Sequence, residues 1–480
     1  MRDSLISRRT TLGFGLAWAA EFTRAAGATP PGRSVDVVIL GAGIAGLHAA
    51  RMLEGAGLDV LVLEGSGRVG GRCWTAYDLP GRPELGAEQI GYGYGRVRAN
   101  ASDLGVTLTA PKTGAMGETR LPPMAVSVGG APPTADFAAS PLNRLAPDEK
   151  ALSPLALYGR YLLKDDPLKS LQDWTKPEFA PIDQMGVGAY LAGRGASAEA
   201  LRMIDVTLPA WGLGSASALD MLRKNHYYFW DAKNGPYSVA KDGSSSLVMA
   251  MARSLKRAPL LNRRVVSLRA GPRAVGVTCA DGSAFEGRTC INTIPPTVLV
   301  DIPVDGAAPD QRESWRRQRS DQSLQVCFRV TEPFWEKDGL PASMWTDGPF
   351  HFFAHTPSWT EPVGVLRAFV NGPAVQPLSQ LAPSELHRRA VAELVRLRPA
   401  ARGVVSVAGV MNWSTYPYSK GHVAYFMPGD ISRYADVVGR PIGAMFFAGE
   451  HLSRVNAGLE GACESAETAA IGVLERLGKG

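Results

Sequence analysis

VDVVILGAGIAGLHAARMLEGAGLDVLVLE, at residues 35–64, is the most informative stretch of this chain. It contains an apolar run, a glycine-rich turn, a segment with helical apolar periodicity that stops at Gly55 and Gly57, and a second apolar run that ends at Glu64. This order predicts a strand, a helix and a parallel strand, the unit that binds dinucleotide cofactors. We therefore expect an α/β fold.

The small residues of the turn have separate roles in such a unit. Gly41 makes the tight turn, Gly43 lets the backbone approach a pyrophosphate, and Gly46 lets the helix pack on the strand. Ala45 lies in the same turn, at the helix N-terminus, whose positive potential favours a phosphate. Glu64 is placed to accept a hydrogen bond from a ribose hydroxyl. These residues are the first candidates for a cofactor site.

The segment after Glu64 favours FAD over NAD. It reads GSGRVGGRCWT at residues 65–75 and brings a second glycine group, with Gly71, beside Arg68 and Arg72. Backbone N–H groups and a guanidinium would then lie against the pyrophosphate of a long, permanently bound cofactor. A surface glycine turn is the alternative interpretation of this segment.

Composition excludes several classes of protein. The 480 residues exceed what one hydrophobic core usually organises, so we expect two lobes with a crevice between them. With 45% hydrophobic and 20% charged residues, the chain is neither disordered nor collagen-like. A net charge of +6 is too mild to indicate a nucleic-acid partner. The five cysteines form no CxxC pair, so we expect isolated buried thiols and neither a disulfide framework nor a metal site.

The N-terminal residues 7–28, SRRTTLGFGLAWAAEFTRAAGA, resemble a twin-arginine export signal. A paired arginine precedes a short apolar run, and Ala26-Gly27-Ala28 is typical of a cleavage site. The run is shorter than the roughly 20 residues needed to span a bilayer, so an uncleaved anchor is the weaker alternative and we expect no stable membrane span. We predict that residues 1–28 are a signal peptide and that the protein is exported to the periplasm or secreted.

Several motifs, in this order, resemble those of the flavin-containing amine oxidase family, which includes monoamine, polyamine and L-amino acid oxidases. They are VVILGAGIAGLHAA, LEGSGRVGGR, PELGAEQIG, INTIPPTVL, EPFW, NWSTYPYSKG, AYFMPGD and FFAGEHLSRVNAGLEGACESAETAA. The likeness runs from about Val35 to the last helix and is weakest over residues 113–237. The resemblance implies FAD as cofactor and a small-molecule amine as substrate.

The resemblance also implies how the chain is divided. We expect a Rossmann-like FAD-binding lobe of the amine oxidase, or p-hydroxybenzoate hydroxylase-like, type, interleaved with a mixed α+β substrate-binding lobe. The FAD lobe would comprise residues 35–112, 238–300 and 440–478, and the substrate lobe residues 113–237 and 301–439. Independently, alternating apolar and polar residues over 264–294, with turns at Gly271 and at Asp281-Gly282, predict a hairpin sheet.

Further cofactor contacts are implied by the family pattern. Val266 would contact adenine through its backbone, and Gly449 and Glu450 would meet the ribityl or phosphate region. The Leu459 N–H, at the positive end of a helix that opens at Gly458 and ends near Leu477, would meet the N1/O2 edge of the flavin. The residues expected near flavin N5 are Gly86, Ala87, Glu88 and Gln89. Ordinary strand, turn and helix structure is the alternative for each of them.

The sequence departs from the family where two tyrosines usually enclose the substrate amine, because His422 and Gly458 fall at those places. His422 would accept a proton from the substrate ammonium or orient it, and a structural or solvent-facing histidine is the alternative. Gly458 removes a wall, which suggests a bulkier substrate or a close backbone approach. Trp413 matches a family tryptophan beside the flavin, and with Gln89 it would line the pocket.

A second departure concerns electron transfer. The family lysine that holds a water against flavin N5 falls on Gln325, which can bind the water but brings no cation. A developing superoxide-like charge would lose stabilisation, so the electron acceptor is either O₂, reacting slowly, or a periplasmic protein or quinone. No cysteine lies around Lys420, so we expect non-covalent FAD.

Three alternatives stay open. An L-amino acid oxidase needs an arginine to clamp the substrate carboxylate, for which Arg96, Arg98 and Arg120 are candidates, although a solvated surface charge is the favoured interpretation of each. A desaturase or porphyrinogen oxidase shares the GGR signature. The alternative of another class is a non-catalytic FAD-binding partner protein. The pattern leaves the oligomeric state open.

Overall fold

The computed structural model describes residues 34–111, 123–356, 358 and 360–479, so the predicted signal at residues 1–28 lies outside the described part. The predicted strand, helix and strand are confirmed, and the two strands are parallel neighbours with Val37 opposite Val60. The three elements are β1 (Val35–Leu40), α2 (Ile44–Gly55) and β2 (Val60–Leu63).

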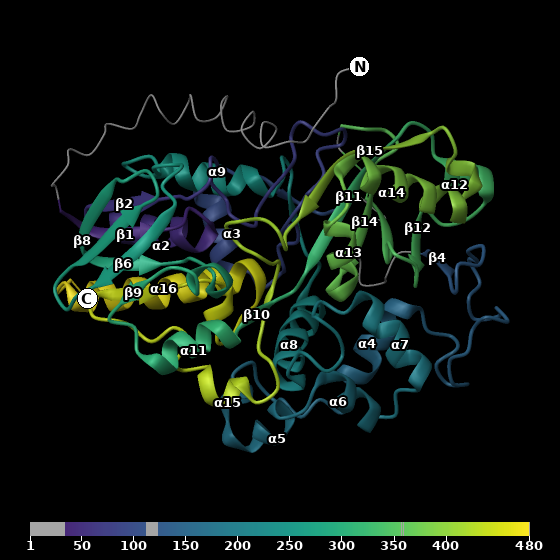
Figure 1. The fold of residues 1–480 in the computed structure, drawn as a ribbon, viewed down its shortest axis with the longest axis horizontal. Helices are drawn as coiled ribbons and strands as arrows, with labels where there is room; N and C mark the ends of the chain where they lie inside the picture. Colours follow the sequence, from purple (N-terminus) through teal and green to yellow (C-terminus); the bar gives the residue numbers. More distant parts are fainter. Residues whose placement is uncertain (1–33, 112–122, 357, 359, 480) are drawn as a thin grey trace.

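The first sheet, at the left of Figure 1, joins three distant parts of the chain in the order β2-β1-β8-β7-β6-β9, with β17 pairing with β8. Its other strands are β6 (Val265–Ala270), β7 (Val275–Cys279), β8 (Ala284–Asn292), β9 (Val304–Asp305) and β17 (Met445–Phe447). Strands β6, β7 and β8 are antiparallel neighbours, which confirms the hairpin sheet predicted over 264–294. Strands β1 and β17 both pair with β8 in parallel, so the N-terminal and C-terminal segments meet in one sheet.

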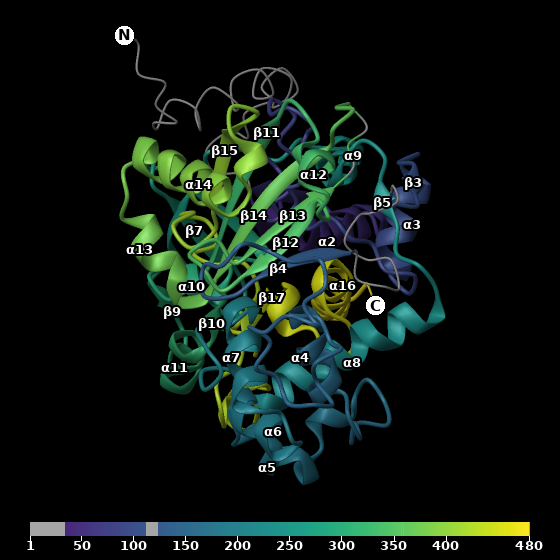
Figure 2. The same cartoon turned by 90° about the vertical axis from the view of Figure 1, so that its right-hand side faces the viewer.

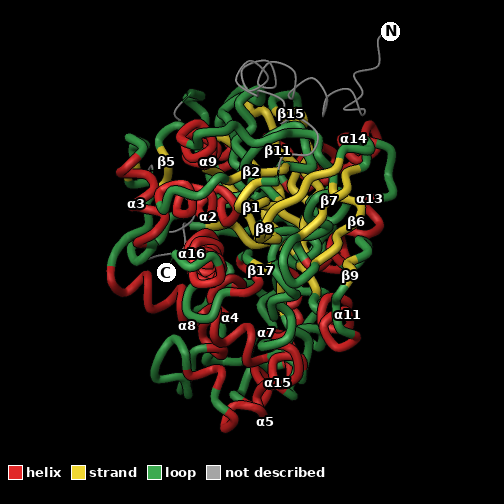
Figure 3. The backbone as a smooth tube through the Cα atoms, turned by 90° about the vertical axis from the view of Figure 1, so that its left-hand side faces the viewer, coloured by secondary structure: helices red, strands yellow, loops and turns green. Residues whose placement is uncertain are grey.

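One long helix, α16 (Gly458–Arg476), packs against α2 beside this sheet (Figure 3). Both helices contribute small side chains to one core, including the buried Ala49, Ala466 and Ala470, and small side chains allow a close approach. The helix predicted to open at Gly458 and end near Leu477 is therefore confirmed. Its N-terminus and that of α2 are both next to the cavity described below.

The second sheet has the order β15-β11-β14-β13-β12-β4 and lies to the right in Figure 1. Its strands are β4 (Met124–Ser127), β11 (Ser323–Val330), β12 (Ser343–Thr346), β13 (Phe352–Thr356), β14 (Val365–Asn371) and β15 (Val405–Asn412). Helix α14 (Pro383–Leu397) packs on it through an apolar core that includes Phe350 and Phe353. Phe350 and Phe353, from the stretch FHFF at residues 350–353, are thus core residues.

A group of helices lies below the second sheet in Figure 2 and completes the mixed α+β part of the molecule. It comprises α4 (Pro154–Leu162), α5 (Ala180–Asp183), α6 (Val187–Gly193), α7 (Ala198–Thr207) and α8 (Ala218–Asn234). Two further helices are α3 (Gly95–Asp103) and α9 (Ser244–Ser254), and two further short strands are β10 (Arg319–Ser320) and β16 (Ala424–Tyr425). Helix α8 carries the aromatic stretch at residues 226–230 to one edge of the cavity.

The exact lobe boundaries stay a prediction. One strand from the segment predicted for the substrate lobe lies in the first sheet, with the strands of the predicted FAD lobe. β9 pairs in parallel with β6 in the first sheet, although its residues fall in the segment 301–439. Two residues are too few to show an alternating pattern, so the sequence had no signal for this strand. Within the described residues no helix is long and apolar enough to cross a membrane. All five cysteines are free and buried, as predicted.

Candidate active site

The main candidate site is a cavity, partly open to solvent, beside the glycine turn, the start of α16 and the loop 416–423. A concave site with a few converging polar groups is typical of cofactor and substrate binding. The sequence-predicted residues that line it are Gly41, Gly43, Ala45, Glu64, Gly71, Arg72, Ala87, His422, Gly449, Glu450 and Leu459. Those that do not line it are Gly46, Arg68, Gly86, Glu88, Gln89, Val266, Gln325 and Trp413.

The glycines of the first turn differ in what surrounds them. Gly41 has a φ of +105° and a Cβ there would overlap the hydroxyl of Thr293, so both conformation and space require glycine. A Cβ at Gly46 would overlap the carbonyl oxygen of Gly41, so the glycine lets helix α2 pack closely against the turn. A Cβ at Gly43 would meet nothing within 4 Å, because this position faces the open cavity.

Glu64 and the start of α2 offer matched acceptors and donors to a dinucleotide. The buried Glu64 carboxylate accepts the Ala42 N–H at 2.8 Å through Oε2, and the Ser66 N–H at 2.8 Å and hydroxyl at 2.7 Å through Oε1. A carboxylate has about four acceptor positions, so one remains for a ribose hydroxyl. Helix α2 has no side-chain cap at Gly43, which leaves its first N–H groups for an anion.

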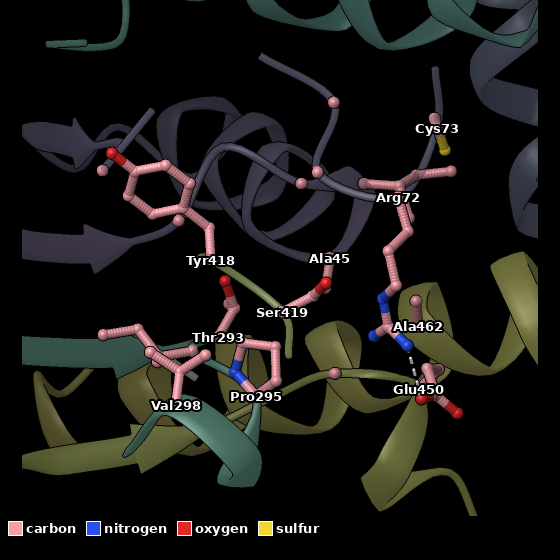
Figure 4. Close-up of a pocket in the computed structure, with 18 of the residues that line it drawn as sticks. Ala45, Arg72, Cys73, Thr293, Pro295, Val298, Tyr418, Ser419, Glu450 and Ala462 are labelled. Atoms are coloured by element: carbon pink, nitrogen blue, oxygen red, sulfur yellow. Dashed lines mark hydrogen bonds and ion pairs between the residues drawn. The ribbon is translucent and has the colours of Figure 1, made fainter. Parts of the chain in front are cut away.

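Arg72 spans the cavity from the second glycine turn to Glu450, as Figure 4 shows. Its Nη1 lies 2.9 Å from Glu450 Oε1 and also donates to the backbone carbonyl of His422. Burial alone would raise the pKa of Glu450, but the nearby cations Arg72 and Lys224 lower it to about 2. The pair therefore stays ionised and ties the two sides of the cavity together.

Arg68, predicted to lie against the pyrophosphate, packs inside the second glycine turn and does not line the cavity. Its guanidinium lies 3.7 Å from the centre of the Trp74 ring and donates to the carbonyls of Val69 and Cys73, both at 3.2 Å. It thus stabilises the second glycine turn from within, and of the two predicted arginines only Arg72 reaches the cavity.

The loop at residues 84–89 lies directly behind Arg72. A Cβ at Gly86 would overlap the carbonyl oxygen of Arg72, so the glycine allows this close approach, and Ala87 is the loop residue that lines the cavity. Glu88 instead forms an ion pair of 3.0 Å with the buried Arg367. Gln89 is exposed.

Gln325 and Trp413 support this loop. Gln325 Nε2 donates to the Leu85 carbonyl at 3.1 Å, and Trp413 Nε1 donates to the same oxygen at 2.7 Å. Both side chains are buried, and neither lines the cavity. The role of Gln325 in holding a water stays a prediction.

At the far end of the cavity the lining residue is the neighbour of Val266, whose contact with adenine stays a prediction. Val265 lines the cavity, whereas Val266 does not. The register of β6 against β7 shifts between Val265 and Ser267, so Val266 lies in a bulge. A single extra residue in a strand exchanges the two faces, and the alternating pattern of the sequence does not reveal it.

At the other end, His422 and Gly458 both line the cavity, so the two departures from the family pattern lie in one place. Gly458 has a φ of +57°, and a Cβ there would lie 3.3 Å from the hydroxyl of Tyr94 and 3.4 Å from that of Tyr228. Tyr228 also lines the cavity. Tyr228 belongs to the aromatic stretch HYYFW at residues 226–230, and the phase of helix α8 brings this one residue of the stretch to the cavity lining.

A family model described as flavin containing amine oxidoreductase matches residues 44–474. This chain belongs to that family. The match covers most of the described chain, including the second sheet and every strand of the first sheet except β1, and it supports an enzyme rather than a non-catalytic FAD-binding partner.

Related proteins of the family include oxidases of amines and of amino acids. The chain is 29% identical over 470 residues to an L-amino-acid oxidase of Siganus canaliculatus, covering 92% of this chain and 85% of that protein. It is 25% identical over 475 residues to the flavin-containing amine oxidase B of Homo sapiens, covering 92% and 87%. Among solved structures, cyclohexylamine oxidase from Brevibacterium oxydans IH-35A superimposes with a TM-score of 0.75 at 22% identity, over 93% of this chain and all of that one.

As a flavin-containing amine oxidoreductase, the protein uses FAD, bound non-covalently. The described residues fit this cofactor: Gly43 leaves open space, the start of α2 is uncapped, Glu64 keeps an acceptor position and Arg72 supplies a cation. The start of α16 at Leu459 directs a second helix N-terminus into the same cavity. The fold and the Rossmann-like unit expected from the sequence are thus confirmed.

Proposed function

We propose that this flavoprotein oxidises an amine that carries no α-carboxylate. The arginines of the main cavity support this choice. Arg72 is paired with Glu450, and Arg263 lies 3.0 Å from Asp281. Arg264, the third arginine of the lining, directly precedes Val265 at the predicted adenine end. A buried substrate carboxylate would need a free cation beside His422, and the described lining has none there.

The arginines considered for a carboxylate clamp are engaged elsewhere. Arg96 pairs with Glu460 at 3.0 Å and also with Glu467. Arg98 donates to the Gly91 carbonyl and the Ser238 hydroxyl. Neither lines the main cavity, and Arg120 lies outside the described residues. L-amino acid oxidation stays the second candidate, because the chain is also similar to an L-amino-acid oxidase.

In the proposed reaction, FAD supplies the hydride acceptor, N5, for the hydrogen of the substrate α-carbon. The protein groups orient, deprotonate and desolvate the amine. His422, Tyr228 and Ala87 line the cavity. His422 would take the ammonium proton, and Tyr228 and the loop at Ala87 would limit the space around the α-carbon. The released imine would react with water to give a carbonyl compound and ammonia or a smaller amine.

The physiological electron acceptor and the location are further parts of the proposal. Gln325 stands where the family has a lysine, which supports slow reaction with O₂ and transfer to a periplasmic protein or quinone. Residues 1–28 would direct export of the folded, FAD-loaded protein. Such a route suits a protein that must acquire its cofactor before it crosses the membrane.

The experiment that tests the substrate class uses matched pairs that differ only in the α-carboxylate, such as phenethylamine with phenylalanine, tryptamine with tryptophan and cadaverine with lysine. Purified holoprotein is incubated with each compound and an artificial electron acceptor, and the carbonyl product is quantified by mass spectrometry. The proposal predicts turnover of at least one amine and a much lower kcat/KM for its amino acid. Preference for the amino acids would replace it with the second candidate.

A further inference from the structure

Behind His422 lies a buried carboxylate that the sequence did not single out. Asp321 is 1% exposed and directly follows β10, while His422 shortly precedes β16. The two strands are antiparallel, with Ser320 opposite Ala424. The Asp321 N–H donates to the Val423 carbonyl at 2.8 Å, and the His422 N–H donates to the Asp321 carbonyl at 2.9 Å. The backbone therefore fixes the two residues next to each other.

A glycine makes this approach feasible. Gly421 has a φ of +153°, and a Cβ there would overlap the side chain of Ser320 and lie 3.2 Å from the Asp321 carbonyl oxygen. Any larger residue would push the histidine segment away from Asp321. The local chain is thus built to bring His422 against the end of β10.

The side chains of the pair face each other. His422 Nδ1 lies 3.8 Å from Asp321 Oδ2, and neither carboxylate oxygen of Asp321 has a hydrogen-bond partner among the described residues. Burial raises the pKa of Asp321, and the neighbouring His422 acts in the opposite direction. A buried carboxylate is costly without a donor, and the imidazole is the one ion-pair partner within 4.0 Å in the described structure.

The imidazole is held from other directions as well. It lies roughly parallel to the Trp413 ring, at 30° and with 6.3 Å between the ring centres. The His422 backbone carbonyl accepts a hydrogen bond from Arg72. With Nδ1 toward Asp321, the other ring nitrogen, Nε2, lies on the edge of the ring away from Asp321, and His422 lines the cavity.

We propose that Asp321 is a positioning residue that holds His422 as the proton acceptor for the substrate ammonium, an inference that rests on the proposed amine substrate. The proton leaves the ammonium nitrogen and bonds to Nε2, which gives a neutral amine and an imidazolium. Asp321 balances the new positive charge and keeps the other proton on Nδ1. The His422 side chain is 30% exposed, so the proton can then pass to water.

Other charged groups near His422 are already neutralised. Arg72 is paired with Glu450, and Lys420 is paired with Asp301. The Lys224 ammonium, on α8, lies 2.7 Å from Asp220 and also donates to the Ala424 carbonyl. Asp321 is therefore the charged group that would neutralise a protonated His422 imidazole.

The first test measures the rate of anaerobic flavin reduction by an amine substrate between pH 6 and pH 10 in Asp321→Asn. Without the carboxylate the ammonium keeps its proton to higher pH, so the profile should shift upward by about one to two pH units. The rate near neutral pH should fall about 10- to 100-fold, and the two proteins should converge at high pH. His422→Gln should show a similar shift, and adding Asp321→Asn to it should change little more.

A matched control separates this role from a general effect of losing a buried carboxylate. Asp183 is buried and hydrogen-bonded to Ser217 and Ser432, away from the cavity lining. Asp183→Asn should leave the pH profile in place. If the pH profile of Asp321→Asn keeps the wild-type midpoint, whatever its maximal rate of flavin reduction, the proposal is overturned.

The second test does not depend on turnover. Nitrogen-15 NMR of histidine-labelled, FAD-loaded protein reports which ring nitrogen carries the proton, and His422→Gln assigns the signal. The proposal predicts a proton on Nδ1 in the wild type and a mixed or Nε2-protonated ring in Asp321→Asn. An unchanged tautomer refutes the pairing. If no amine reduces the flavin but the tautomer changes, the proposed substrate fails while the pairing stands.

Discussion

The hydroxyl of Tyr228 lies 3.4 Å from the point at which a side chain on Gly458 would begin. Tyr228 and Gly458, which are far apart in the chain, are thus neighbours on the cavity wall. The family pattern expects an aromatic ring from the α16 side, and here α8 contributes one instead. The missing wall inferred from Gly458 is therefore replaced in part by Tyr228.

Shortening Tyr228 should widen the amine end of the cavity. Tyr228→Ala is expected to retain FAD and to change relative kcat/KM values in favour of bulkier amines by about tenfold, the scale of pocket-shape effects. Steady-state kinetics on a series of amines with increasing substituent size checks this. Phe229→Ala is the matched control, since Phe229 is the adjacent exposed aromatic residue and does not line the cavity. An equal change in both variants would contradict the assignment.

Two glycines of the first turn should respond differently to alanine. Gly46→Ala forces a methyl group into the Gly41 carbonyl and should lower the free energy of unfolding by about 2–4 kcal/mol. Gly43→Ala has free space in the protein but narrows the cofactor path, so the apoprotein should stay stable while FAD affinity falls at least about tenfold. Denaturant unfolding of the apoprotein and FAD titration distinguish them. The reverse pattern would be inconsistent with FAD lying across Gly43.

Glu84 gives a pH-dependent contribution to stability. Burial, with the nearby Glu88, raises the pKa of Glu84 from 4.5 to about 7. The folded protein therefore keeps a proton on Glu84 that the unfolded chain releases. As the pH rises from about 4.5 through 7, this difference in proton binding lowers the free energy of unfolding by up to about 3 kcal/mol. Glu84→Gln should remove this slope. Urea unfolding from pH 4.5 to 8 measures it, and an unchanged slope in the variant would show that Glu84 is not responsible.

Much of the fold follows from local signals, whereas parts of the site do not. The glycine turn, the hairpin sheet and α16 each have a complete pattern within one segment, and all were predicted. Asp321 carries no motif, and its pairing with His422 arises only when β10 meets β16. The bulge at Val266, beside the lining residue Val265, leaves no mark on composition. Long-range pairing and local irregularity are therefore what the sequence alone misses.

The proposed export signal lies outside the described structure. Replacing the pair Arg8 and Arg9 by lysines should retain the protein, loaded with FAD, in the cytoplasm, because the twin-arginine pair is the proposed address. Cell fractionation with immunodetection and flavin fluorescence measures this. A periplasmic variant, or a cytoplasmic wild type, would remove the export proposal without affecting the enzymatic one.

Anaerobic stopped-flow spectroscopy of the purified holoprotein tests the central claim most directly. The protein is mixed with each amine and its matched amino acid, and the bleaching of oxidised flavin is followed before any acceptor is added. We predict that an amine reduces the flavin in a rapid, saturable phase and that its α-carboxylated counterpart does so far more slowly. Rapid reduction by the amino acid alone, or by neither class, would contradict the account.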